Sequence, residues 1–193
     1  RPPDNANLYP GQNTTGLCPV DAFDGTPLYL DGQTPDEAEI AARREAVWQP
    51  YHAQLARELA RIRSLHGVAV LWDAHSIRSM VPRFFEGRLP DFNLGTADGA
   101  SCDPALAEAV LAIANAAPGY TAVLNGRFKG GHITRHYGQP TNGVHAIQME
   151  MAQCTYMQEQ MPFDYLPKTA AQVKPHLQAM LQAVLAFAET SRS

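Results

Sequence analysis

The stretch Val68–Ser79, VAVLWDAHSIRS, places an apolar run directly before several polar side chains. Its first part, Val68–Asp73, is almost continuously apolar, which predicts a strand that is covered on both faces. Asp73, His75 and Arg78 then lie where this predicted strand ends. Polar residues are common where a strand runs out into solvent. They are equally expected at a functional site, because ligands of α/β proteins bind at the carboxyl ends of strands.

Helical and strand patterns alternate on both sides of this stretch. A helix is predicted from Thr34 to His66, with Thr34 and Glu37 as a capping box, Gly67 as a stop, and a kink or break near Pro50. Further strands are predicted over 120–125 and 144–151, with a short one around 27–30, and further helices from 104 to 117 and over 170–190. The alternation predicts a single α/β domain over residues 1–193 on a mostly parallel or mixed sheet.

Composition limits the class of protein. The 193 residues are 45% hydrophobic and 18% charged, with a formal net charge of -4, which argues against binding of nucleic acid by the chain as a whole. No apolar run approaches the roughly 18–20 residues of a membrane span, so no transmembrane segment is predicted. Three widely spaced cysteines favour reduced thiols in a cytoplasmic protein. Because the chain opens on Arg1 within a proline-rich loop, we expect a processed or truncated piece of a longer protein.

Asp73 and His75 are two residues apart, so in an extended chain they point to the same side. A histidine that ligates zinc usually donates its second ring N–H to a carboxylate, and Asp73 is suited to that role for His75. The alternative is a loop histidine that is hydrogen-bonded near the surface, since one histidine does not make a metal site.

Glu150 ends an apolar segment, HAIQMEM, over residues 145–151. Alternation places Ala146 and Gln148 on the same face as Glu150, and the opposite face carries His145, Ile147, Met149 and Met151. A carboxylate in such a strand is costly unless it is paired, hydrogen-bonded or functional. Either this second face is simply hydrated, or Glu150 is a general base or a metal-associated acid.

A cationic segment, NGRFKGGHITRHYG over residues 125–138, precedes that strand. It carries Arg127, Lys129 and Arg135, and no Asp or Glu occurs between Glu108 and Glu150. Such a field favours a small anionic substrate, whose carboxylates guanidinium groups bind bidentately; the alternative is a solvated basic loop. The histidines at 132 and 136 would suit a metal only in a helix, which the flanking glycines argue against.

The loop after His75 carries further arginines, including Arg78, and leads into FNLGT, where Asn93 and Thr96 either orient a polar ligand or make a turn.

Several motifs occur together in a fixed order, and as a set they resemble the N-formylglutamate amidohydrolases. The motifs are LYPGQNTTGLCP, FDGTPLY, DAHSIRS, FEGRLPDFNLGT, NGRFKGGHITRHYG and HAIQMEM…YM. The resemblance runs from residue 1 to about residue 165.

The resemblance implies a zinc-dependent hydrolase with a three-layer α/β/α sandwich on a mixed sheet, related to the zinc carboxypeptidases and to the succinylglutamate desuccinylase and aspartoacylase group. It implies release of formate and L-glutamate from N-formyl-L-glutamate, a late step of histidine breakdown. By position, His75 matches a zinc ligand and Glu150 the base. The family's other histidine and acidic ligands belong to an upstream segment with a P-H-x-G-like motif, and this sequence begins downstream of it.

Within this hypothesis Arg78, Arg127 and Arg135 are the candidates for gripping the two substrate carboxylates, with Arg135 ranked first, and Asn93 is a further candidate for substrate binding. Two alternatives stay open. One is an amidohydrolase of another N-acyl amino acid, and the other is a carboxylate-binding domain without metal or catalysis.

Overall fold

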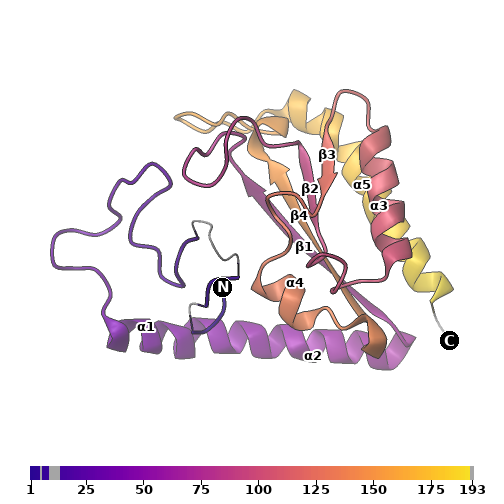
Figure 1. The fold of residues 1–193 in the computed structure, drawn as a ribbon, viewed down its shortest axis with the longest axis horizontal. Helices are drawn as coiled ribbons and strands as arrows, with labels where there is room; N and C mark the ends of the chain where they lie inside the picture. The colour runs from indigo at the N-terminus through magenta and orange to yellow at the C-terminus, as the bar shows by residue number, and fades with distance from the viewer. Residues whose placement is uncertain (5, 9–13, 192–193) are drawn as a thin grey trace.

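Four strands form one mixed sheet in the computed structural model, which describes residues 1–4, 6–8 and 14–191 (Figure 1). Their order across the sheet is β1-β4-β2-β3. Strands β1 and β4 are parallel, β2 and β3 are parallel, and β2 and β4 are antiparallel. The bounds are Ala69–Ile77 for β1, Phe92–Gly95 for β2, Ala122–Leu124 for β3 and Val144–Ala152 for β4.

Helices cover both faces of the sheet. Helices α3 (Pro104–Ala116) and α5 (Pro167–Thr190) pack over one face, where they bury the main apolar core (Figure 1). Helices α2 (Gln49–His66) and α4 (His132–Tyr137) lie against the other. The predicted three-layer α/β/α sandwich is therefore confirmed. Among the described residues no helix has the length and apolar character needed to span a membrane.

Strand β4 has the predicted two-sided pattern, and both of its faces are buried. Ile147 and Met149 pack into the core under α3 and α5. On the other face Gln148 is 5% exposed and Glu150 is 7% exposed. The interpretation of this second face as simply hydrated is therefore wrong, because α4 and the segment before it cover it.

The long N-terminal helix breaks where Pro50 predicts a break. Helix α1 (Glu37–Arg43) passes into a π-helical turn over Arg44–Trp48, and α2 follows with Pro50 in its first turn. Proline has no N–H to donate to an upstream carbonyl, so this turn is the natural place for irregular geometry. The predicted cap at Thr34 is corrected to Asp36, which accepts a 2.8 Å hydrogen bond from the Glu39 N–H.

Several strand boundaries differ from the predicted ones. Strand β1 continues to Ile77, because its parallel pairing with β4 extends to the pair Ile77 and Ala152; Asp73 and His75 thus lie inside the strand. The predicted strand around 27–30 is an isolated bridge between Asp21 and Pro27. Strand β3 is shorter than predicted, and α5 begins at Pro167 with Pro175 inside it.

The chain between β3 and α4 crosses the sheet directly above Gly95. A Cβ at Gly95 would lie 2.5 Å from the Gly130 nitrogen and 2.6 Å from the Lys129 carbonyl carbon. Gly130 itself has φ +107°, a conformation that L side chains rarely adopt. This crossing delivers the chain into α4. The glycines therefore position a helix at His132 and His136, contrary to the expectation that they would prevent one.

We predict that Gly95→Ala destabilises the protein by about 1–3 kcal/mol, because backbone atoms cannot move aside for the added methyl group. Gly131→Ala is the matched control, since its Cβ would meet only Gln148 Oε1, at 3.4 Å. Urea denaturation of both variants measures the difference. Equal stability of the two variants would contradict the close crossing.

Candidate active site

Three side chains from distant parts of the sequence stand in one row on the sheet face that α4 covers. In the β1–β4 pairing His75 lies opposite Glu150, and in the β2–β4 pairing Asn93 lies opposite Glu150. Paired residues of neighbouring strands share a face. The next row along the strands contains Asp73, Gln148 and Gly95. The register of β4 therefore assembles the site.

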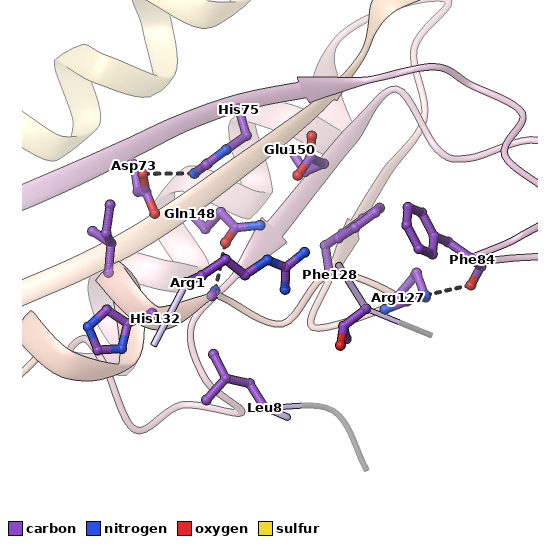
Figure 2. Close-up of a pocket in the computed structure, with 13 residues that line it drawn as sticks. Arg1, Leu8, Asp73, His75, Phe84, Arg127, Phe128, His132, Gln148 and Glu150 are labelled. Atoms are coloured by element: carbon purple, nitrogen blue, oxygen red, sulfur yellow. Dashed lines mark hydrogen bonds and ion pairs between the residues drawn. The ribbon is translucent and has the colours of Figure 1, made fainter. Parts of the chain in front are cut away.

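A pocket of about 270 Å³ opens over these rows (Figure 2). Asp73, His75, Gln148 and Glu150 form the side contributed by the sheet. The remaining lining comes from the N-terminal segment, the loop after β1, the segment between β3 and α4, and the start of α4: Arg1, Leu8, Thr14, Phe84, Arg127, Phe128, Gly131, His132 and Ile133. The pocket lies on a sheet face and is walled by loops, which is the form of a small-molecule site.

His75 and Asp73 form the predicted hydrogen bond, with 2.9 Å between His75 Nε2 and Asp73 Oδ1. This bond is the main cause that raises the pKa of His75, and burial opposes it. The carboxylate also fixes the direction of the imidazole ring. The pair thus has the arrangement in which a carboxylate orients a functional histidine.

Glu150 is a buried carboxyl group close to this pair. Its pKa is raised to about 7, mainly by burial; the charge of His75 opposes this shift and the charge of Asp73 adds to it. A group with this pKa populates both protonation states near neutral pH. It can therefore accept a proton and return it within one reaction cycle.

Two contacts tie together the segments that follow β1 and β4. The Glu159 carboxylate accepts hydrogen bonds from Ser79 N and Oγ, both at 2.6 Å, and from Cys154 N at 2.9 Å. The hydroxyls of Ser76 and Tyr156 are also hydrogen-bonded, at 2.8 Å. These bonds hold the carboxyl ends of the two strands that carry His75 and Glu150.

The wall opposite these carboxylates is cationic and aromatic. Arg127 lies against Phe84 and Phe128, with its guanidinium carbon 5.9 and 5.3 Å from the two ring centres. Its Nε donates to the Phe84 carbonyl at 2.7 Å (Figure 2). Arg1 also lines the pocket. The site therefore has an acidic side and a basic side.

The structure does not bring the other predicted substrate-binding residues into the pocket lining. Arg78 lies over the Phe163 ring, and Arg135 Nε donates to the Gly130 carbonyl at 2.9 Å. Asn93 donates through Nδ2 to the carbonyls of Pro90 and Glu150, so it joins β2 to β4. Thr96 accepts from the Gly99 N–H and makes a turn. Roles of Arg78, Arg135 and Asn93 in substrate binding stay predictions.

Sequence reasoning missed several lining residues. Gln148 was detectable, because alternation already placed it on the Glu150 face. His132 enters the pocket because α4 forms, and burial lowers its pKa to about 4, which keeps it neutral. Arg1, Phe84 and Phe128 reach the pocket through loop conformations that no periodic pattern encodes.

A complete metal site is not formed by the described residues. No group of three histidine, cysteine or acidic side chains within residues 1–4, 6–8 and 14–191 is arranged to hold an ion. A catalytic zinc needs about three protein ligands. His75 is suited to supply one, and the zinc prediction stays a prediction.

Taken together, the three-layer sandwich and a pocket that pairs a proton-accepting carboxyl group with an oriented histidine define a hydrolase-like α/β protein. The comparisons with known proteins name the family. The family model for N-formylglutamate amidohydrolase matches residues 1–157. The chain is 56% identical over 187 residues to N-formylglutamate deformylase of Pseudomonas aeruginosa and 54% identical to that of Pseudomonas putida. The chain belongs to the N-formylglutamate amidohydrolase family.

Solved structures agree with this assignment. The crystal structure of N-formylglutamate amidohydrolase from Ralstonia eutropha superposes with a TM-score of 0.75 at 25% identity, covering 92% of this chain. A protein of Agrobacterium tumefaciens, 20% identical with a TM-score of 0.55, shares the fold. The chain spans 70% of the length of each Pseudomonas deformylase and 62% of the Ralstonia chain.

The raised pKa of Glu150 predicts how the stability of the folded state depends on pH. Between pH 4.5 and about 7 the unfolded state loses this proton while the folded state keeps it, so the folded state is progressively penalised as pH rises. Glu150→Gln removes the penalty. With a chelator present, we expect the variant to be more stable than the wild type by up to about 3 kcal/mol above pH 7. The gap should close below pH 4.5.

Urea denaturation between pH 4.5 and 8 measures this gap, with Glu189→Gln on the exposed side of α5 as the control. A stability difference between Glu150→Gln and the wild type that is independent of pH would show that Glu150 has no raised pKa.

Proposed function

We propose that this protein hydrolyses the formyl amide of N-formyl-L-glutamate and releases formate and L-glutamate. The observation that carries the proposal is Glu150, a buried carboxyl group with a pKa of about 7, beside the His75–Asp73 pair in a pocket with a cationic wall. Family membership supports the substrate, because the two Pseudomonas relatives are named N-formylglutamate deformylases.

In the proposed reaction Glu150 takes a proton from a water molecule, which attacks the formyl carbon. The resulting tetrahedral species carries negative charge on the former carbonyl oxygen and needs hydrogen-bond donors or a cation there. Glu150 then returns the proton to the leaving nitrogen, which departs as the amine of L-glutamate while formate remains. His75, held by Asp73, borders the same reacting centre.

The two sides of the pocket suit the two ends of this substrate. Its glutamate part carries two carboxylates, which the field around Arg127 attracts. Its formyl amide is neutral and is tolerated beside Asp73 and Glu150. This polarity favours one orientation, with the formyl group at the strands and the carboxylates toward the basic wall.

The finer parts of the proposal rest on the family resemblance. We include zinc as the metal, with His75 as one ligand, a place in histidine degradation and a cytoplasmic location. Zinc would supply a Lewis acid and lower the pKa of a bound water. Metal content of the intact natural protein, compared between wild type and His75→Ala, tests this part by elemental analysis.

Substrate and base are tested together by turnover of the intact natural protein. We expect formate release from N-formyl-L-glutamate to exceed release of the acyl group from N-acetyl- and N-succinyl-L-glutamate. Glu150→Gln should lower kcat by about 10²–10⁴-fold because the base is lost. Unchanged turnover in this variant removes Glu150 from the mechanism. Binding of N-formyl-L-glutamate without any turnover by the wild type would instead favour a carboxylate-binding domain.

Arg127→Lys tests the basic wall. An ammonium group keeps the charge and loses the planar fork that binds carboxylates bidentately. We expect kcat/KM for N-formyl-L-glutamate to fall about tenfold, mainly through KM. Arg61→Lys, on the exposed side of α2 where Arg61 pairs with Glu58, is the matched control. The assignment fails if both variants have the kinetics of the wild type.

A further inference from the structure

Gln148 lies at the centre of the pocket, in a role that the acid–base chemistry leaves unassigned. It is 5% exposed and stands on β4 two residues before Glu150, in register with Asp73 on β1. Successive side chains on one strand face are about 6.6 Å apart. The terminal amide of Gln148 is therefore within reach of any small group that reacts at Glu150.

One hydrogen bond fixes the orientation of this amide. The Gly131 N–H donates to Gln148 Oε1 at 2.7 Å. A backbone N–H requires an acceptor, so the oxygen faces Gly131 and the nitrogen faces the other way. Figure 2 shows Oε1 directed at that nitrogen and Nε2 turned away from it. Within the described part of the chain, Gly131 is the one hydrogen-bond partner of this side chain.

The amide nitrogen thus presents two N–H donors to the pocket without the flexibility of a free glutamine. This nitrogen is not among the buried side-chain atoms of the described residues that lack a hydrogen-bond partner, so its N–H groups are open to the pocket, where a ligand atom can replace water as their acceptor. The ligand atom that meets them must be an acceptor.

The surrounding charges decide which acceptor this is. Asp73 lies opposite Gln148 on β1, and Glu150 follows it on β4, so a substrate carboxylate is repelled from this position. A neutral carbonyl oxygen is not. A carbonyl whose carbon is attacked by a water at Glu150 also has its oxygen within a few ångströms of that carboxyl group.

We propose that Gln148 Nε2 donates a hydrogen bond to the carbonyl oxygen of the scissile formyl amide and holds that oxygen as negative charge develops on it. The inference rests on the proposed function. It makes Gln148 a substrate-binding residue, and it makes the Gly131 N–H the group that orients the Gln148 side-chain amide. A preorganised donor of this kind does not need to reorient during the reaction.

The hydrogen bond from the Gly131 N–H to Gln148 also holds the start of α4, because Gly131 directly precedes that helix. Two substitutions distinguish the proposed role of Gln148 in substrate binding from this structural role. Gln148→Glu keeps an oxygen acceptor for the Gly131 N–H and removes both donors, whereas Gln148→Met removes donors and acceptor with nearly the same side-chain length. Gln172→Met, on the exposed side of α5, is the matched control. In the intact natural protein we expect both Gln148 variants to lose about 10²–10³-fold in kcat, with a smaller change in KM. Gln172→Met should match the wild type.

A binding measurement supplies a readout that does not depend on turnover. In a Glu150→Gln background, calorimetry compares N-formyl-L-glutamate with L-glutamate, which lacks the acyl carbonyl. Adding Gln148→Met should weaken binding of the formyl compound about tenfold and leave L-glutamate within about twofold.

The outcomes are distinct. Equal weakening of both ligands, or a Gln148→Glu variant with wild-type kcat, overturns the donor role and leaves only the anchoring of α4. A wild-type protein that does not turn over N-formyl-L-glutamate overturns the proposed function and this inference with it. Normal wild-type turnover together with unchanged Gln148 variants overturns the inference alone.

Discussion

The parallel pairing of β1 with β4 is the interaction on which the site depends. It sets His75 opposite Glu150 and Asp73 opposite Gln148, although 75 positions separate the members of each pair in the sequence. A shift of one residue in this register would turn one partner of each pair to the other face of the sheet. The apolar residues Ile147 and Met149 under α3 and α5 oppose such a shift, because it would expose them and bury polar side chains. The apolar packing on the face under α3 and α5 therefore determines which side chains meet on the face under α4.

Burial of polar side chains is the second constraint. The face below α4 holds a carboxyl group and an amide that are almost inaccessible, and it accommodates them in different ways. Glu150 responds by a raised pKa, which makes it neutral part of the time. Gln148 responds by giving its oxygen to a backbone N–H. As a result, Glu150 can exchange a proton in the pocket, and the Gln148 amide nitrogen can donate hydrogen bonds there. An apolar lining of the same shape would provide neither.

Sequence patterns predicted the features of the fold that are determined by residues adjacent in the chain. Pro50 marked the break between α1 and α2, and alternation in β4 gave the correct division into two faces. The end of β1 was placed too early, because strand length there follows from pairing with β4 and not from the run of apolar residues. The helix at His132 was missed because glycine propensity argues against it, whereas the close crossing at Gly95 requires glycine just before it.

The same limits apply to the site. Asp73, His75 and Glu150 were recognisable because a polar residue at the end of an apolar run is conspicuous. The sequence could not show which arginine enters the pocket, because Arg78, Arg127 and Arg135 all belong to cationic segments. In the structure, Arg127 is the one of these three that lines the pocket. The crossing above Gly95 has a further consequence for the breadth of substrates. Gly131 follows this crossing directly and lines the pocket without a side chain, so the width of the cavity there cannot be increased by exchanging one side chain for a smaller one. Room for a larger substrate would have to be sought at the aromatic rings of Phe84 and Phe128, where the boundary is made of side chains and where the proposed orientation places the carboxylate end of the substrate.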